Sequence, residues 1–102
     1  MVSIEISRLA KDDLNKIWKY YAEFDVAKAQ EFMLRFQAEL ALLANNVHLG
    51  RKVDHYFIGL RRLGFEDYFV FYFSNRDFIE IYRIVHQSRD IEGMFENHFR
   101  KL

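Results

Sequence analysis

Apolar and polar residues alternate at the start of the chain and then change to helical spacing. Residues 1–6 place Val2, Ile4 and Ile6 on one side, which is the period of a half-buried strand. Ser7 is an N-cap candidate for the segment that follows. There the apolar side chains at helical intervals are Leu14, Ile17, Trp18 and Tyr21. The pattern predicts a short first strand and then an amphipathic helix.

A second helical stripe begins after Asp25, which is also an N-cap candidate. Its apolar members are Ala29, Phe32, Met33, Phe36, Leu40, Leu43 and Val47. Only about three residues, 23–25, separate this segment from the first helix. Because so short a connection forces the chain to reverse, we expect the two helices to pack as an antiparallel hairpin.

The second half of the chain has the pattern of strands. Residues 56–63 and 78–85 are rich in aromatic and β-branched side chains, and residues 68–73 are apolar throughout. A continuous apolar run is typical of a strand that is covered on both faces. Polar segments at 47–55 and 74–77 are predicted to be connections. We therefore expect a three-stranded antiparallel meander with residues 68–73 at its centre.

The tail, residues 90–102, favours a short terminal helix with Met94, Phe95 and Phe99 as apolar members, although Gly93 weakens it. Together the elements predict an α+β fold and a single domain over 1–102. In its two layers, the N-terminal strand and the helical hairpin pack on a small antiparallel meander. We expect the hairpin to cover one face of the sheet and the other face to be open.

Composition narrows the classes of function. The chain has 102 residues, 51% of them hydrophobic and 18% aromatic, which predicts a packed core. Its formal net charge is zero, so direct binding to DNA is not expected. The absence of cysteine excludes disulfides and thiol nucleophiles. Since we find neither an apolar run that could span a membrane nor a secretory signal, we expect no membrane association and a cytoplasmic location.

Residues of common catalytic chemistries are scattered. The histidines, none at the spacing of a zinc site, are His48, His55, His86 and His98. Glycines stand singly, so no phosphate-binding loop is expected. The neighbouring carboxylates at 12–13 and 66–67 are predicted on a helix surface and in a turn, where solvation explains them. The sequence therefore predicts neither a metal nor a cofactor.

A basic set marks the second half of the chain. Its members are Arg51, Lys52, Arg61, Arg62, Arg83 and Arg89, with His86 among them. In a regular strand Arg83 would share a face with Ile81 and Val85, and His86 would lie on the opposite face, so convergence needs a bulge. Two interpretations stay open. The set is either solvated and ion-paired, or it is a surface that binds a partner's carboxylates or phosphates.

Short motifs accompany these elements over about 80 residues. They are Asp13-Leu14, Ile17-Trp18 and Tyr21 in the first helix, Leu49-Gly50-Arg51, Gly59-Leu60-Arg61, Tyr68 with Phe71-Tyr72, Ile81 with Arg83, His86, and Arg89-Asp90. In order and spacing they resemble the ParE branch of the ParE/RelE superfamily, the toxins of bacterial type II toxin–antitoxin pairs. The resemblance implies the same fold, with a helical hairpin followed by a meander.

The resemblance implies two possible activities. ParE-like members inhibit DNA gyrase by protein contact, and RelE-like members cut mRNA on the ribosome with a basic cluster and an acid–base group. The neutral charge and the lack of a tyrosine after Tyr82 favour the gyrase inhibitor, which is not an enzyme. The alternative is a ribonuclease that uses Arg61, Arg83, His86 and Arg89. A non-toxic binding module of the same fold is a further alternative.

The resemblance also implies a ParD-like antitoxin and therefore a hetero-oligomer. Our candidates for antitoxin binding are the aromatic residues of the hairpin, Trp18, Tyr20, Tyr21, Phe24 and Phe36. Our candidates for target binding, which we expect to be exposed at the end of the meander and in the tail, are Arg83, Arg89, Asp90, Met94, Phe95 and Phe99.

Overall fold

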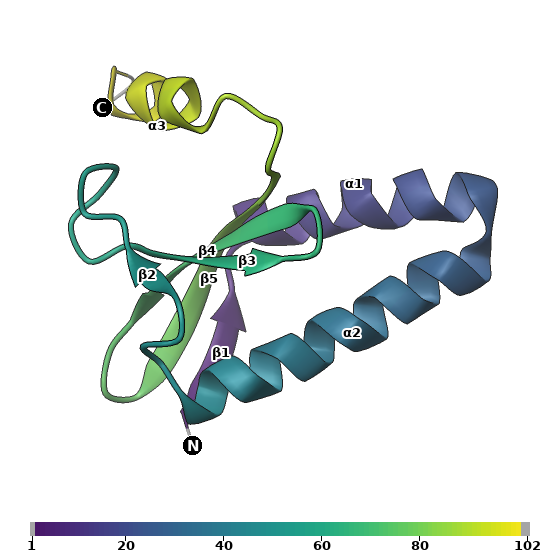
Figure 1. Cartoon of the computed structure of the whole chain (residues 1–102), viewed down its shortest axis with the longest axis horizontal. Helices are drawn as coiled ribbons and strands as arrows, with labels where there is room; N and C mark the ends of the chain where they lie inside the picture. The colour runs from purple at the N-terminus through teal and green to yellow at the C-terminus, as the bar shows by residue number, and fades with distance from the viewer. Residues whose placement is uncertain (1, 101–102) are drawn as a thin grey trace.

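A computed structural model describes the backbone of residues 2–100 and the side chains of residues 2–96. Its elements are β1 (Ser3–Ile6), α1 (Arg8–Phe24), α2 (Val26–Asn45), β2 (Arg51–Lys52), β3 (Arg61–Phe65), β4 (Tyr68–Ser74), β5 (Phe78–His86) and α3 (Ile91–Arg100). The strands form one sheet in the order β1-β5-β4-β3-β2 (Figure 1). β1 runs parallel to β5, and the other neighbours are antiparallel. The predicted α+β fold is confirmed.

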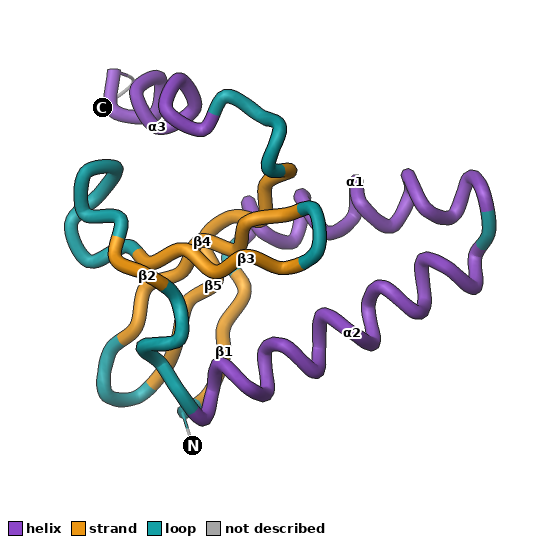
Figure 2. The backbone as a smooth tube through the Cα atoms, in the orientation of Figure 1, coloured by secondary structure: helices purple, strands orange, loops and turns teal. Residues whose placement is uncertain are grey.

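The helical hairpin begins and turns at the residues that the sequence predicts. Ser7 caps α1, since its Oγ accepts a hydrogen bond from the backbone N–H of Ala10 at 3.1 Å. Asp25 caps α2 in the same way through the N–H of Ala27, at 2.9 Å. Asp25 is the whole connection, which is shorter than the three residues that we predicted. Because the turn is so tight, α1 and α2 lie side by side and extend beyond the sheet (Figure 2).

One face of the sheet packs on this hairpin. Phe32 of α2 is fully buried there and lies edge-on against Phe65 and Tyr68, with ring centroids 5.5 and 5.6 Å apart. The buried residues of this core cluster are Ala10, Ile17, Phe32, Phe36, Leu43, Phe65, Tyr68, Val70, Tyr72, Ile79, Ile81 and Ile84. The predicted stripes of both helices therefore face the sheet, as amphipathic helices do.

Our prediction that the other face of the sheet is open is wrong. A second cluster of buried residues covers it, made of Val53, Leu60, Phe71, Val85, Ile91 and Phe95. The cover comes from the loop of residues 53–60 and from α3, which lie at the left in Figure 1, whereas the hairpin lies at the right. Because β4 is apolar on both sides, its second face needed this cover.

The predicted strand at 56–63 begins only at Arg61. Residues 53–60 instead close on themselves, because the N–H of Val53 donates to the carbonyl of Leu60 at 3.0 Å. Gly59 has φ +87°, in the left-handed region that glycine tolerates, and its N–H donates to Asp54 Oδ1 at 2.8 Å. The loop is thus a folded unit that lies over the sheet.

A bulge interrupts β5 and changes which face its side chains take. Phe71 pairs with Arg83, but Tyr72 pairs with Ile81, so Tyr82 has no partner residue on β4. Ile81 and Ile84 both pack in the hairpin cluster, whereas Val85 packs in the second one. The alternation of a regular strand therefore does not hold across β5, and Arg83 is turned toward α1, as the next section describes.

Candidate functional site

Arg83, a candidate both for target binding and for catalysis, is held by Asp13 of α1. Its Nε lies 2.8 Å from Asp13 Oδ2 and its second guanidinium nitrogen lies 3.0 Å from Oδ1, which is a bidentate pair. The side chains are only 16% and 10% exposed. The hydrogen bond with Asp13 raises the pKa of Arg83. The prediction that solvation explains the carboxylate of Asp13 is therefore wrong.

The same carboxylate completes the edge of the sheet. β1 ends at Ile6, and Ser7 then donates its N–H to the carbonyl of Ile81 at 2.9 Å and its hydroxyl to that of Tyr82 at 2.7 Å. Asp13 Oδ2 accepts the next free N–H, that of Ile84, at 2.9 Å. Since a buried N–H needs an acceptor, Asp13 replaces a strand at this point, and Arg83 neutralises it.

Four cations of the basic set lie at the opposite edge of the sheet, as two cross-strand pairs that point to opposite faces. β2 pairs with β3 so that Arg51 lies opposite Arg62 and Lys52 opposite Arg61. We call these four residues the basic edge. Like charges in directly opposite positions are destabilising, and no ion pair between described residues includes any of the four. For this part of the set the second interpretation, an anion-binding surface, is favoured.

The loop that leads to the basic edge is fixed by a buried tyrosine. The hydroxyl of Tyr72 accepts the N–H of Gly50 at 2.8 Å and donates to the carbonyl of Val47 at 2.9 Å. A Cβ on Gly50 would lie 2.7 Å from the ring of Tyr72, so only glycine fits. Arg61 donates to the carbonyl of Gly50 at 2.7 Å. Burial raises the pKa of Tyr72, although the hydrogen bond with Gly50 opposes this. These contacts explain the Leu49-Gly50-Arg51 motif.

His86 lies in a cleft at the other end of β4. The cleft has a volume of about 510 Å³, and we call it the His86 cleft; its lining residues are Tyr20, Tyr21, Asp67, Tyr68, His86 and Ser88. Nδ1 of His86 accepts the N–H of Ser88 at 3.1 Å and lies 2.7 Å from its hydroxyl. Nδ1 of His86 therefore serves as a hydrogen-bond acceptor for the turn that follows β5.

Tyr68 forms the wall of the His86 cleft that adjoins the core. Its ring lies edge-on to His86, with centroids 5.3 Å apart. Burial, the charge of Tyr21 and a hydrogen bond with Tyr21 raise the pKa of Tyr68 to about 12. The phenol is therefore neutral at physiological pH.

The four residues of the ribonuclease alternative do not come together. Arg61 pairs with Tyr72 and His86 with Tyr68, and these two partners are four residues apart on β4, roughly 13 Å along the strand. Arg83 is held by Asp13, and Arg89 is exposed in the turn that follows β5. The bulge in β5 therefore does not bring the set together.

The tail candidates for target binding differ in exposure. Asp90 caps α3, since its Oδ1 accepts the N–H of Gly93 at 3.0 Å. Our prediction that Phe95 is exposed is wrong, because it is only 3% exposed and packs against Phe71 in the second cluster. Met94 is half-buried, and Phe99 lies outside the side chains that the structure describes.

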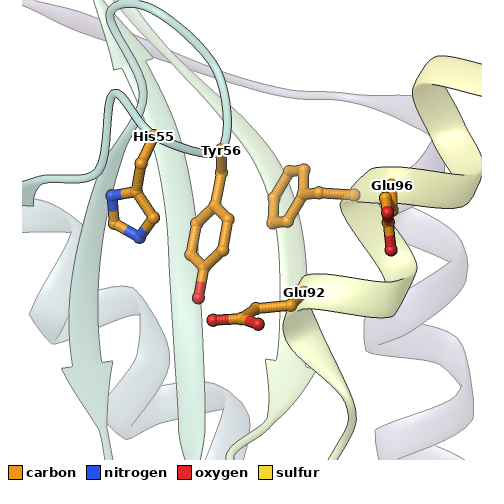
Figure 3. Close-up of a pocket in the computed structure, with 5 residues that line it drawn as sticks. His55, Tyr56, Glu92 and Glu96 are labelled. Carbon is orange, nitrogen blue, oxygen red and sulfur yellow. The ribbon is translucent and has the colours of Figure 1, made fainter.

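A second hollow lies between the loop 53–60 and α3. Its volume is about 310 Å³, and its lining residues are His55, Tyr56, Glu92, Phe95 and Glu96. Tyr56 stacks on Phe95, with ring centroids 4.9 Å apart, and its hydroxyl end points toward Glu92 (Figure 3). Beside the hollow, at the tip of the loop, Phe57 and Ile58 are 41% and 85% exposed. Sequence reasoning missed this exposed tip, because we took residues 56–63 for a strand.

The hairpin candidates for antitoxin binding also differ in exposure. Tyr20 and Phe24 are 57% and 71% exposed, and Trp18 and Tyr21 are half-buried. Phe36 is 2% exposed and belongs to the core, so its assignment to a docking surface is wrong. On α2, three further exposed apolar residues that the sequence reasoning missed are Val26, Leu34 and Leu42. Their exposure could have been predicted, because these three residues lie outside the apolar stripe of α2.

The described part of the chain has neither a cluster of metal ligands nor a membrane-spanning helix. No three His, Asp or Glu side chains gather there as metal ligands would. None of its helices is both long and apolar enough to cross a membrane.

Comparison with known proteins gives the family. Residues 4–91 match the ParE toxin of the type II toxin–antitoxin system parDE. The chain belongs to the ParE toxin family. This ParE-family toxin is 32% identical over 89 residues to Toxin ParE1 of Caulobacter vibrioides, a match that covers 86% of this chain and 92% of the relative. The family resemblance stated from the motifs is thus confirmed.

Solved structures share the fold of this ParE-family toxin. A chain of the chromosomal ParDE system from P. aeruginosa superimposes with a TM-score of 0.71 at 22% identity, over 84% of this chain and 96% of that one. YafQ from E. coli superimposes with a TM-score of 0.63 at 18% identity, over 86% and 96%. Both likenesses support the fold of the toxin.

Proposed function

We propose that this type II toxin inhibits DNA gyrase by direct protein contact and that a ParD-like antitoxin neutralises it. The observation that carries the proposal is the charge of the His86 cleft. Its described lining residues include a carboxylate, Asp67, and no lysine or arginine. Cleavage of a phosphodiester develops negative charge that cationic groups must stabilise, so this environment suits His86 poorly as a nuclease base.

The basic edge supports a protein target. Its four cations lie on an exposed or half-exposed sheet edge, where they can meet the carboxylates of another protein. Arg62 is already oriented, because its guanidinium lies 4.3 Å from the centroid of the Phe69 ring. Arg89, Asp90 and Met94 stay predictions as further target contacts, and we add the exposed tip of the loop, Phe57 and Ile58.

The exposed apolar residues of the hairpin support an antitoxin partner. They are Leu9, Tyr20, Phe24, Val26, Leu34 and Leu42. Tyr20 and Phe24 lie edge-on with ring centroids 5.5 Å apart, and neighbouring exposed apolar side chains of this kind are typical of a protein-binding surface. A folding segment of an antitoxin would bury them and so form the hetero-oligomer.

The test compares two assays on the purified toxin. We expect inhibition of gyrase supercoiling without ribosome-dependent cleavage of mRNA, and restored supercoiling when the antitoxin is added. Cleavage of mRNA that falls about 100-fold or more in His86→Ala would contradict the proposal, because that is the loss expected for a general base.

A charge reversal tests the basic edge. We expect Lys52→Glu to weaken gyrase inhibition about 10-fold, since it replaces attraction to carboxylates with repulsion. Arg76→Glu is the matched control, because Arg76 is exposed in the turn between β4 and β5 and is not one of the four residues of the basic edge. Equal losses in the two variants would show that only overall charge matters.

A further inference from the structure

The His86 cleft has a single uncompensated charge, which is the carboxylate of Asp67. The neighbouring Glu66 is paired with Arg35, whose Nε lies 2.6 Å from its carboxylate. No ion pair between described residues includes Asp67. Because the described lining contains no lysine or arginine, the cleft presents this carboxylate without a guanidinium or ammonium group beside it.

The turn that carries Asp67 is fixed. The carbonyl of Asp67 accepts the backbone N–H of Gln87 at 2.8 Å. The side chain of Gln87 donates to the carbonyls of Glu66 and Tyr68, both at 3.2 Å. The carboxylate is therefore presented from a rigid base, which reduces the conformational entropy that a ligand must remove on binding.

Three tyrosines surround this charge. Tyr20 is more than half exposed and lies edge-on to Tyr21, with ring centroids 5.4 Å apart. Tyr68 is buried at the base of the cleft, with its ring edge-on to His86. The faces of aromatic rings carry partial negative charge and attract cations. The aromatic rings and the carboxylate thus favour the same kind of ligand, which is a cation.

We propose that the His86 cleft binds a basic side chain, arginine or lysine, of the antitoxin. The proposal rests on the proposed function for the identity of the partner. Tyr20 belongs both to the cleft and to the exposed hairpin surface that we assign to the antitoxin, so one bound segment reaches both. A phosphate group would instead meet the carboxylate of Asp67 with no described cation beside it.

The first test needs no partner protein. N-acetyl-arginine methylamide is added to the isotope-labelled toxin, and amide shifts are followed by NMR, with the uncharged citrulline analogue as a control probe. We expect saturable shifts at Tyr68 and Ser88 with the arginine probe only. Equal shifts with both probes, or none with either, would overturn the proposal.

Matched variants then locate the charge. Asp67→Asn is expected to weaken binding of the arginine probe about 5-fold, within the range of an exposed ion pair with an adjacent ring. Asp77→Asn is the control, because Asp77 is also exposed in a turn, at the far end of β4, and its loss changes the net charge equally. A loss of the same size in both variants would overturn the assignment of the site.

The second test measures antitoxin affinity. We expect Asp67→Asn and Tyr20→Leu each to weaken it about 10-fold, which corresponds to about 1.4 kcal/mol, with Asp77→Asn unchanged. Both residues are exposed, so the variants should fold, and melting temperatures check this. Weakened gyrase inhibition with unchanged antitoxin affinity would overturn the choice of partner. Probe binding and antitoxin affinity can both be measured on a toxin that does not inhibit gyrase. The two proposals can therefore fail separately.

Discussion

The two faces of the sheet are covered in different ways. On one face, two helices of 17 and 20 residues each present an apolar stripe. On the other, the loop 53–60 and the short α3 cover Phe71 and Val85. A long amphipathic helix reveals its buried side by its own spacing, whereas a short cover is revealed only by the surface beneath it. The apolar run at residues 68–73 already indicated that both faces are covered, and the tail was the segment available to do so.

The largest expected effect separates the two faces. Phe32→Ala should lower the free energy of unfolding by about 4 kcal/mol, because Phe32 is fully buried between the long helix α2 and the sheet. Phe95→Ala should cost only about 2 kcal/mol, since α3 can detach while the rest of the sheet stays folded. Chemical denaturation gives the free energies, and hydrogen exchange at residues 91–96 reports detachment. Equal costs without faster exchange in α3 would show that both faces unfold as one unit.

The second largest effect is expected at the ion pair that links the hairpin to the sheet edge. Asp13→Ala leaves Arg83 without its partner and the N–H of Ile84 without an acceptor, so we expect a loss of about 3 kcal/mol. Asp12→Ala, at the exposed neighbouring position, should stay within about 0.5 kcal/mol of the parent. Similar denaturation midpoints for these two variants would show that the ion pair contributes little.

A smaller effect is expected where the hairpin face meets the basic edge. Tyr72→Phe removes the hydroxyl that joins Gly50 to Val47, and it should cost about 2 kcal/mol because a buried N–H loses its acceptor. Melting temperature measures the loss. Tyr20→Phe, at an exposed position of α1, is the comparison variant and should cost less. The opposite order would mean that the loop before β2 is held by other contacts.

The smallest effect appears only in alkaline solution. Folding raises the pKa of Tyr68 from an ordinary value of 10 to about 12, so its neutral form is favoured in the folded state. This contribution to stability is complete below pH 10 and is lost as the pH rises through about 12. Unfolding free energies across that range should fall less steeply for Tyr68→Phe. The pKa values of Tyr72 and Tyr82 are raised in the same direction, so part of the slope should persist.

Local chemistry predicted the fold well, and long-range contacts explain what was missed. Ser7 and Asp25 were identifiable as caps because a cap acts on residues only two or three positions away. The pair of Asp13 with Arg83 joins residues 70 positions apart, and nothing in the spacing of either residue shows it. The bulge in β5 likewise depends on its partner strand.

The candidate site was predicted less well than the fold, for the same reason. The His86 cleft collects Tyr20 from α1, Asp67 from a turn and His86 from the end of β5. Each of the three residues has an ordinary local setting, so only the folded sheet shows that they share a cleft. The exposure of Phe95 was mispredicted because a terminal helix with an apolar side can either cover the core or bind a partner.

The parallel pairing of β1 with β5 has a consequence for biosynthesis. It joins residues 3–6 to residues 78–81, so the first strand to leave the ribosome waits for the last strand before it can pair. Until then, the edge that β1 and Asp13 complete does not exist. Residues 78–81 therefore have to be synthesised before β1 can pair, and a chain that ends before them cannot complete the sheet.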